Sequence, residues 1–133
     1  MTELDRPEPP AKGTRNAVAH TWGALGYSLA GGRVLAAQRA ARLQLAMFVA
    51  TALAFALVGV RPAQWAVAVA LFLNSLLVEA LNTAIELIVD RVSPEISNFA
   101  KQAKDLGSFA VFCAVLVFGG HAVWVVGAAL LAR

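Results

Sequence analysis

Four polar residues stand three, four and four positions apart in a stretch that is otherwise apolar: Glu79, Asn82, Glu86 and Asp90. At about 100° per residue, these spacings place the four side chains within roughly 80° of one helix face. An acid near the end of a long apolar run is costly to bury, which makes it a candidate for a functional site. The alternatives are polar contacts between packed helices, or a helix that is leaving the membrane.

A lysine and a further acid, Lys104 and Asp105, come immediately before the next apolar stretch. The acids Glu86, Asp90 and Asp105 suit a divalent cation, and the lysine suits a phosphate group. Glu79 lies deeper in the apolar run, where a carboxylate would act as a base on a lipid hydroxyl. This set indicates phosphoryl transfer to a lipid. A proton or ion relay and a helix-bundle assembly subunit are the competing interpretations.

The composition indicates a small membrane protein, because 59% of the 133 residues are hydrophobic and a soluble domain is nearer half apolar. No acid occurs between Glu8 and Glu79, whereas six basic residues do. This charge distribution favours an anionic membrane surface as the neighbour. No basic run with interleaved aromatic residues supports a nucleic-acid partner. Cys113 is the one cysteine, so the chain cannot form an internal disulfide.

Residues 1–14 are rich in proline and charge, and we expect them to form a flexible tail. We expect residues 15–133 to form a single membrane-embedded domain. Its first part, residues 15–40, carries apolar side chains at the four, three and four spacing of one helix face. These side chains are Val18, Trp22, Leu25 and Leu29. The segment is therefore predicted to be an amphipathic helix at the membrane interface.

Three apolar runs predict transmembrane helices at about residues 43–60, 64–91 and 106–131. Between the first two, Gly59-Val-Arg61-Pro62 is typical of a turn, with the proline placed to begin the next helix. Polar residues 95–105 are expected to form a short connection before the third span. The fold class is therefore predicted to be an all-α membrane protein with an interfacial helix and three transmembrane helices.

Three spans place the two termini on opposite sides of the membrane. Basic residues are concentrated in the N-terminal region and in the 91–105 segment, while the 59–63 turn carries only Arg61. The positive-inside rule then places the N-terminus and residues 86–105 in the cytoplasm. The polar residues that begin at Glu79 would therefore end in cytosolic water, where nucleotides are available.

The ordered motif Glu79-Ala-Leu-Asn82-Thr-Ala-Ile-Glu86, then Asp90-Arg91, then Ala103-Lys104-Asp105-Leu-Gly107-Ser108 resembles the signature of the prokaryotic diacylglycerol kinase family, which includes undecaprenol kinases. The match is strong over residues 79–108 and weaker at Gly26-Tyr27-Ser28 with Gly31. The resemblance implies a kinase-like domain in a homotrimer of the bacterial inner membrane. It also implies transfer of the γ-phosphate of ATP, with Mg²⁺, to the primary hydroxyl of a lipid alcohol. Diacylglycerol is the first expected acceptor and undecaprenol the second.

The resemblance also assigns roles to individual positions. Glu79 falls on the general base, which also contacts the lipid, and Glu86 falls on a magnesium ligand. Ser108 falls on a lipid-site position. The positions that fall on the nucleotide site are Tyr27, Asn82, Glu86, Asp90, Glu95, Ser97, Lys104 and Asp105.

One segment departs from the family pattern. The family carries a glutamate at the end of the surface helix, in an E-x-x-F-R-like segment, and this glutamate is the second carboxylate on magnesium. Here the segment reads Gln38-Arg39-Ala-Ala-Arg42. An ungapped alignment puts Arg39 at the position of the glutamate, and a one-residue gap puts Gln38 there. The departure bears on metal affinity and activity, so the alternative is a catalytically weak relative that serves as a structural membrane subunit.

Overall fold

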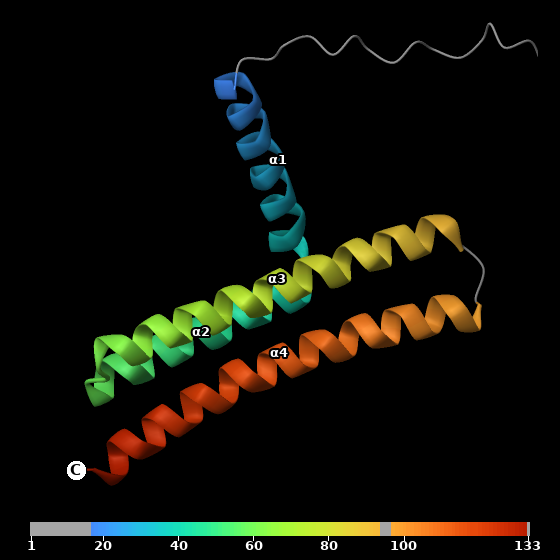
Figure 1. The fold of residues 1–133 in the computed structure, drawn as a ribbon. Coiled ribbons are helices and arrows are strands. Elements are labelled where there is room, and N and C mark those ends of the chain that lie inside the picture. The colour runs from blue at the N-terminus through green and yellow to red at the C-terminus, as the bar shows by residue number, and fades with distance from the viewer. Residues whose placement is uncertain (1–16, 94–96, 133) are drawn as a thin grey trace, which may run out of the picture. The chain divides into compact units, whose positions relative to one another are not determined.

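The computed structural model describes residues 17–93 and 97–132, with side chains from Trp22 onward, and four helices account for nearly all of them. The helices are α1 (Ala17–Ala37), α2 (Arg39–Val58), α3 (Pro62–Val92) and α4 (Asn98–Leu131) (Figure 1). The described ranges contain no strand. The expected tail, residues 1–14, lies outside them. The chain divides after Ala30 into two units, and the second holds the end of α1 together with α2, α3 and α4.

Helix α1 lies within the segment where the sequence predicts a surface helix. The described side chains in the part of α1 that belongs to the first unit are exposed, including Trp22 and Tyr27. Its location at a membrane interface stays a prediction. Gln38 alone separates α1 from α2, because its backbone is extended, with φ −72° and ψ 136°. Residues 39–42 therefore belong to the first spanning helix and not to the surface helix, which ends earlier than residue 40.

The turn between α2 and α3 follows the expected sequence signals. Gly59 ends α2 with φ 71°, a left-handed conformation that glycine adopts without steric cost. The N–H groups of Gly59 and Val60 both donate to the Phe55 carbonyl at 3.1 Å. Pro62 occupies the first position of α3, where its missing N–H costs nothing. The turn predicted at residues 59–62 is confirmed.

Helix α4 begins earlier than expected. Residues 98–105 are helical, so the predicted polar connection at 95–105 is wrong over that range. The helix starts at Asn98 because the Ser97 hydroxyl accepts a hydrogen bond from the Ala100 N–H at 3.1 Å, which caps its first turn. The polar residues 98–105 therefore form the first turns of α4, before its apolar part begins.

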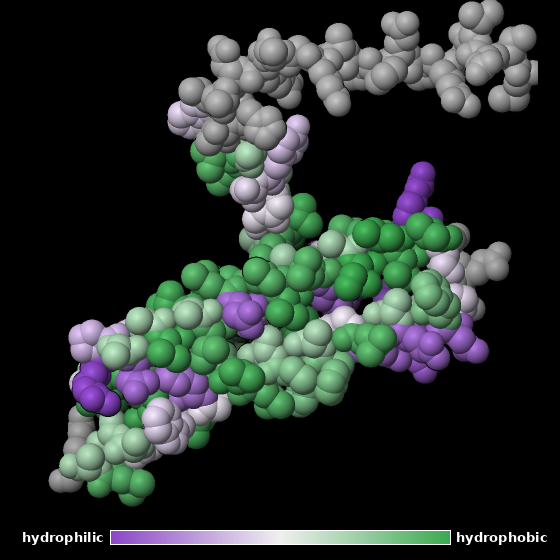
Figure 2. Space-filling view, viewed as in Figure 1, coloured by the Kyte–Doolittle hydropathy of each residue, from purple (hydrophilic) through white to green (hydrophobic). Residues whose placement is uncertain are grey.

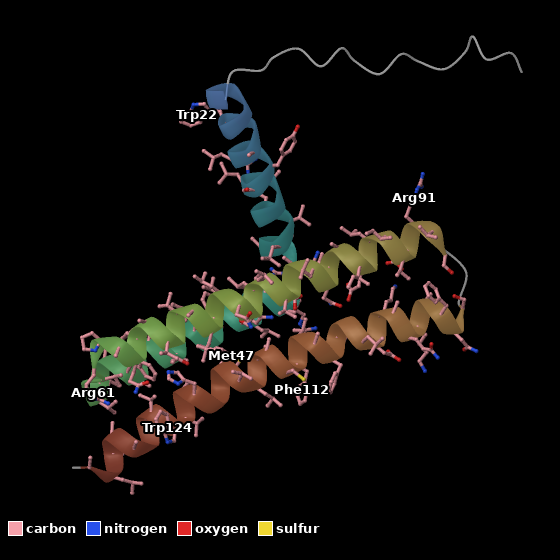
Figure 3. The ribbon with its side chains drawn as sticks, viewed as in Figure 1. Trp22, Met47, Arg61, Arg91, Phe112 and Trp124 are labelled. Carbon is pink, nitrogen blue, oxygen red and sulfur yellow. The ribbon has the colours of Figure 1, made fainter. Side chains whose placement is uncertain are left out.

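Helices α2, α3 and α4 are each long and apolar enough to cross a membrane. In Figure 1, α3 and α4 run antiparallel side by side, and α2 packs against both. Hydrophobic residues cover most of the visible face of these helices (Figure 2), and Arg61 and Arg91 lie at opposite ends of α3 (Figure 3). The prediction of an all-α, multi-pass membrane protein is confirmed. Its trimeric assembly stays a prediction.

Aromatic side chains fill the core between the three helices. The Phe48 and Phe72 rings stack with centroids 4.3 Å apart, and Phe55, which is fully buried, meets Trp65 edge-on at 5.4 Å. His121 on α4 lies with Nε2 3.4 Å from the Gln64 carbonyl, so it connects α4 to the start of α3. These contacts hold α3 in a fixed rotation, which decides where its polar residues point.

Candidate active site

The polar residues of α3 run from the buried core to the exposed end of the helix. Glu79 and Asn82 are 4% and 8% exposed, Glu86 is half-buried, and Asp90 is exposed. The Asn82 amide Nδ2 donates to Glu86 Oε1 at 2.9 Å, which confirms that residues four apart share this face. The helix therefore carries carboxylates from an apolar environment out to a polar one.

Helix α4 approaches α3 closely at Asn82. A Cβ atom added at Gly107 would overlap Asn82 Oδ1 and lie 3.2 Å from Asn82 Cγ. Glycine at this position therefore leaves room for the amide in the orientation in which Asn82 holds Glu86. Asn82 Oδ1 has no hydrogen-bond partner among the described residues, although it is buried. A buried amide oxygen without a partner is an unusual feature that a ligand could satisfy.

Glu79 receives a hydrogen bond from α2. The Gln44 amide Nε2 lies 3.3 Å from Glu79 Oε2, and both residues are 4% exposed. The sequence patterns described above do not indicate Gln44 as a partner of Glu79. The available signal was that Gln44 is one of two polar side chains between Leu43 and Val58, the other being Thr51.

A hollow of about 340 Å³ joins the predicted residues, and we call it the α2–α3–α4 hollow. Helix α3 contributes two carboxylates and one amide to its wall, and α4 contributes Ser108. The junction of α1 and α2 contributes the segment that departs from the family pattern. The lining residues are Gln38, Arg39, Ala40, Glu79, Asn82, Glu86, Ser108 and Val111. The structure therefore brings the predicted base, metal ligand and lipid-site residue together, and adds Arg39.

A second group of predicted residues lies further along α3 and α4. The Lys104 ammonium forms an ion pair with Asp90, and the two side chains are 39% and 64% exposed. Asp105 is exposed beside Lys104. Ser97 caps α4 and lies with its hydroxyl 3.1 Å from that of Ser93.

Two predicted nucleotide-site residues are not joined to this group by the structure. Tyr27 is exposed on α1, in the first of the two units. Glu95 lies outside the described residues. The roles predicted for these two residues stay predictions, as do those of the other site residues.

The donor set around Glu86 fits a metal that arrives with other ligands. Within residues 22–93 and 97–132, no three His, Cys, Asp or Glu side chains gather at metal-binding distance. Glu86 is hydrogen-bonded to Asn82, and Gln38 and Arg39 line the same hollow, where Arg39 adds a positive charge. Such a site suits a magnesium ion whose remaining ligands are phosphate oxygens and water.

The fold and the site together define an all-α, multi-pass membrane protein with buried and half-buried carboxylates facing a hollow near one end of its apolar bundle. The prokaryotic diacylglycerol kinase family matches residues 26–126, and the chain belongs to this family. The resemblance noted from the motif is thereby confirmed.

Individual relatives agree with the family match. A diacylglycerol kinase of Sinorhizobium is 47% identical over 109 residues, which cover 82% of this chain and 80% of the relative. A diacylglycerol kinase of Pseudomonas aeruginosa is 45% identical over 96 residues, covering 71% and 77%. The diacylglycerol kinase of Escherichia coli K12 is 48% identical over a shorter stretch of 42 residues, covering 32% and 34%.

The close approach at Gly107 gives a prediction about stability. Gly107→Ala should lower stability in detergent by roughly 1–3 kcal/mol, because the new methyl group must displace the buried Asn82 amide. Gly120→Ala is the matched control on the same helix, since a Cβ there meets nothing within 4 Å. Thermal unfolding of both variants measures the difference. Equal stability of the two variants would contradict the tight α3–α4 contact.

Proposed function

We propose that this protein is a lipid kinase that transfers the γ-phosphate of ATP to the primary hydroxyl of a membrane lipid alcohol. Diacylglycerol is the first candidate and undecaprenol the second. The observation that carries the proposal is that buried Glu79 and half-buried Glu86 line one hollow within an apolar bundle. Membership of the family and the names of the relatives support diacylglycerol as the acceptor.

In the proposed reaction, Glu79 is the general base. Its carboxylate takes the proton of the lipid hydroxyl while the hydroxyl oxygen forms a bond to the γ-phosphorus of ATP. The bond between that phosphorus and the β,γ-bridging oxygen breaks, and ADP leaves. Glu79 is 4% exposed, which limits the access of water and favours the lipid hydroxyl over water as acceptor. With diacylglycerol, the product is phosphatidic acid.

The remaining residues hold the nucleotide in this proposal. Glu86 would bind the magnesium ion of Mg-ATP, which offsets the negative charge of the phosphates. Asn82 keeps the Glu86 carboxylate in place through its 2.9 Å hydrogen bond. Arg39 lines the same hollow, so its guanidinium can contact phosphate oxygens where the family carries an acid. Lys104 is a further phosphate-binding cation.

The other predicted positions complete the proposal. Ser108, on the wall of the hollow, is assigned to the lipid. The others that we assign to the nucleotide are Tyr27, Asp90, Glu95, Ser97 and Asp105.

The alternative proposal is a catalytically weak relative with a structural role in the membrane. It is favoured by Arg39, because a positive charge beside Glu86 opposes the binding of a free cation. Under both proposals the chain forms a homotrimer in the bacterial inner membrane with its N-terminus in the cytoplasm. Basic residue placement supports this orientation, since Arg61 is the one charge in the turn between α2 and α3.

The role of Glu79 is tested by its isosteric amide. Glu79→Gln should lower lipid-dependent ATP turnover by at least ~100-fold with folding and ATP binding retained, since general-base loss has this magnitude. Glu86→Gln should instead raise the magnesium concentration needed for half-maximal rate. Turnover by purified protein with a panel of lipid alcohols measures both. Near-normal activity of Glu79→Gln would exclude Glu79 as the general base. Loss of assembly in both variants would favour the alternative that the protein is a structural membrane subunit.

The departure at Gln38-Arg39 predicts that magnesium binds weakly without nucleotide. Arg39→Glu should lower the magnesium concentration for half-maximal turnover several-fold, because it restores a carboxylate beside Glu86. Gln38→Glu should do so instead if the family alignment contains the gap. Arg42→Glu makes the same charge change outside the hollow and is the control, since its side chain donates to the Ala37 carbonyl.

A magnesium titration of turnover, together with equilibrium Mg²⁺ binding without ATP, decides between the ungapped and the gapped alignment. Tight binding of Mg²⁺ by the wild type without ATP would contradict the prediction. Inactivity of the wild type and of both restored variants would favour the structural subunit.

The orientation is tested by cysteine labelling in intact cells. In a Cys113→Ala background, Pro62→Cys should react with a membrane-impermeant maleimide, because the α2–α3 turn faces outward in this proposal. Asn98→Cys should react only after the cells are opened. The reverse pattern would overturn the orientation and, with it, the access of cytosolic ATP to the hollow.

A further inference from the structure

Gln44 is a buried amide in an apolar helix. It is 4% exposed on α2, and its Nε2 donates to Glu79 Oε2 at 3.3 Å across 35 positions of sequence. A buried amide costs free energy unless its polar atoms are paired, and in a membrane span water does not supply the missing partner. The hydrogen bond to Glu79 therefore pairs one of the two polar atoms of this amide.

The Glu79 carboxylate depends on this amide for its orientation. Within residues 22–93 and 97–132, Gln44 is the side chain that hydrogen-bonds to Glu79. Glu79 lines the α2–α3–α4 hollow and Gln44 does not, so Gln44 contacts the carboxylate without reaching a molecule in the hollow. Gln44 can therefore affect a reaction in the hollow only through its contact with Glu79 or through the packing of α2.

The other polar atom of Gln44 is unpaired. Gln44 Oε1 is buried and has no hydrogen-bond partner among the described residues. A primary amide carries a donor and an acceptor at nearly equivalent positions, and rotation about its last side-chain bond exchanges them. A general base alternates between a carboxylate, which accepts hydrogen bonds, and a carboxylic acid, which donates one. Gln44 can therefore pair with Glu79 in both states.

We propose that Gln44 is the positioning residue of the catalytic carboxylate and pairs with it before and after proton transfer. Its Nε2–H donates to the Glu79 carboxylate that awaits the lipid hydroxyl. Once Glu79 has taken the proton, the amide turns and its Oε1 accepts from the new carboxylic acid. This inference rests on the proposed function, since it requires Glu79 to act as the base.

The test is a double-mutant cycle on lipid-dependent turnover. Gln44→Met keeps the length and unbranched shape of the side chain but removes its donor and acceptor. It should lower kcat by roughly tenfold to a hundredfold, the effect of losing a hydrogen bond to a charged group. KM for Mg-ATP and for lipid should stay within about twofold, because Gln44 does not line the hollow.

The coupling to Glu79 separates positioning from packing. Glu79→Asp withdraws the carboxylate from Gln44 by about one carbon–carbon bond while keeping an acid. In that background Gln44→Met should change kcat by less than about twofold, because the contact is already lost. Ser75→Ala is the control, since Ser75 is equally buried on α3 but bonds to the Phe72 carbonyl. It should leave kcat unchanged.

The outcomes distinguish this inference from the proposed function. Unchanged kcat in Gln44→Met, or equal losses in the wild-type and Glu79→Asp backgrounds, would overturn the inference alone. If Gln44→Met does not fold, Gln44→Asn replaces it, because this shorter amide also fails to reach Glu79 and should show the same coupling. A wild-type protein that phosphorylates no lipid alcohol would overturn both the proposed function and the inference.

Discussion

A carboxylate inside an apolar bundle needs a hydrogen-bond partner, and this requirement governs the arrangement of α2, α3 and α4. Glu79 is met by Gln44 from α2, and Glu86 is met by Asn82 from its own helix. Asn82 in turn fits only because Gly107 on α4 carries no side chain. Each helix of the bundle therefore contributes one residue without which the polar groups of α3 would be strained or unpaired.

The helices could be predicted from the sequence because their signals are local. Apolar runs of membrane-spanning length, the left-handed Gly59 and the helix-starting Pro62 are readable from neighbouring residues alone. The start of α4 was missed because its first turns are polar, and a polar helix beyond the apolar region has the composition of a loop. The hydroxyl of Ser97, which caps that helix, was the signal available in the sequence.

From helix periodicity alone, the site was predictable only to the extent that it lies on one helix. Glu79, Asn82 and Glu86 share α3, so their periodicity alone places them together. The pairing of Gln44 with Glu79 depends on the rotation and depth of α2 against α3. A hydropathy pattern contains neither quantity. The ion pair between Asp90 and Lys104 likewise depends on how α4 returns along α3.

The length of α2 has a consequence for where the hollow lies in a bilayer. Its 20 residues span ~30 Å, about the thickness of the hydrocarbon layer. The 31 residues of α3 span ~46 Å and must extend beyond that layer. If α2 runs perpendicular to the membrane, a helix of this length has its first residues where acyl chains give way to the glycerol backbones of the lipids.

Arg39 and Ala40, at that end of α2, line the hollow. The depth of the hollow is thus tied to the shortest spanning helix. In a thicker bilayer, the part of the hollow lined by Arg39 and Ala40 would lie level with the acyl chains. In a thinner bilayer, it would lie level with the headgroups. Membrane thickness would then control which part of a lipid molecule lies level with Glu79.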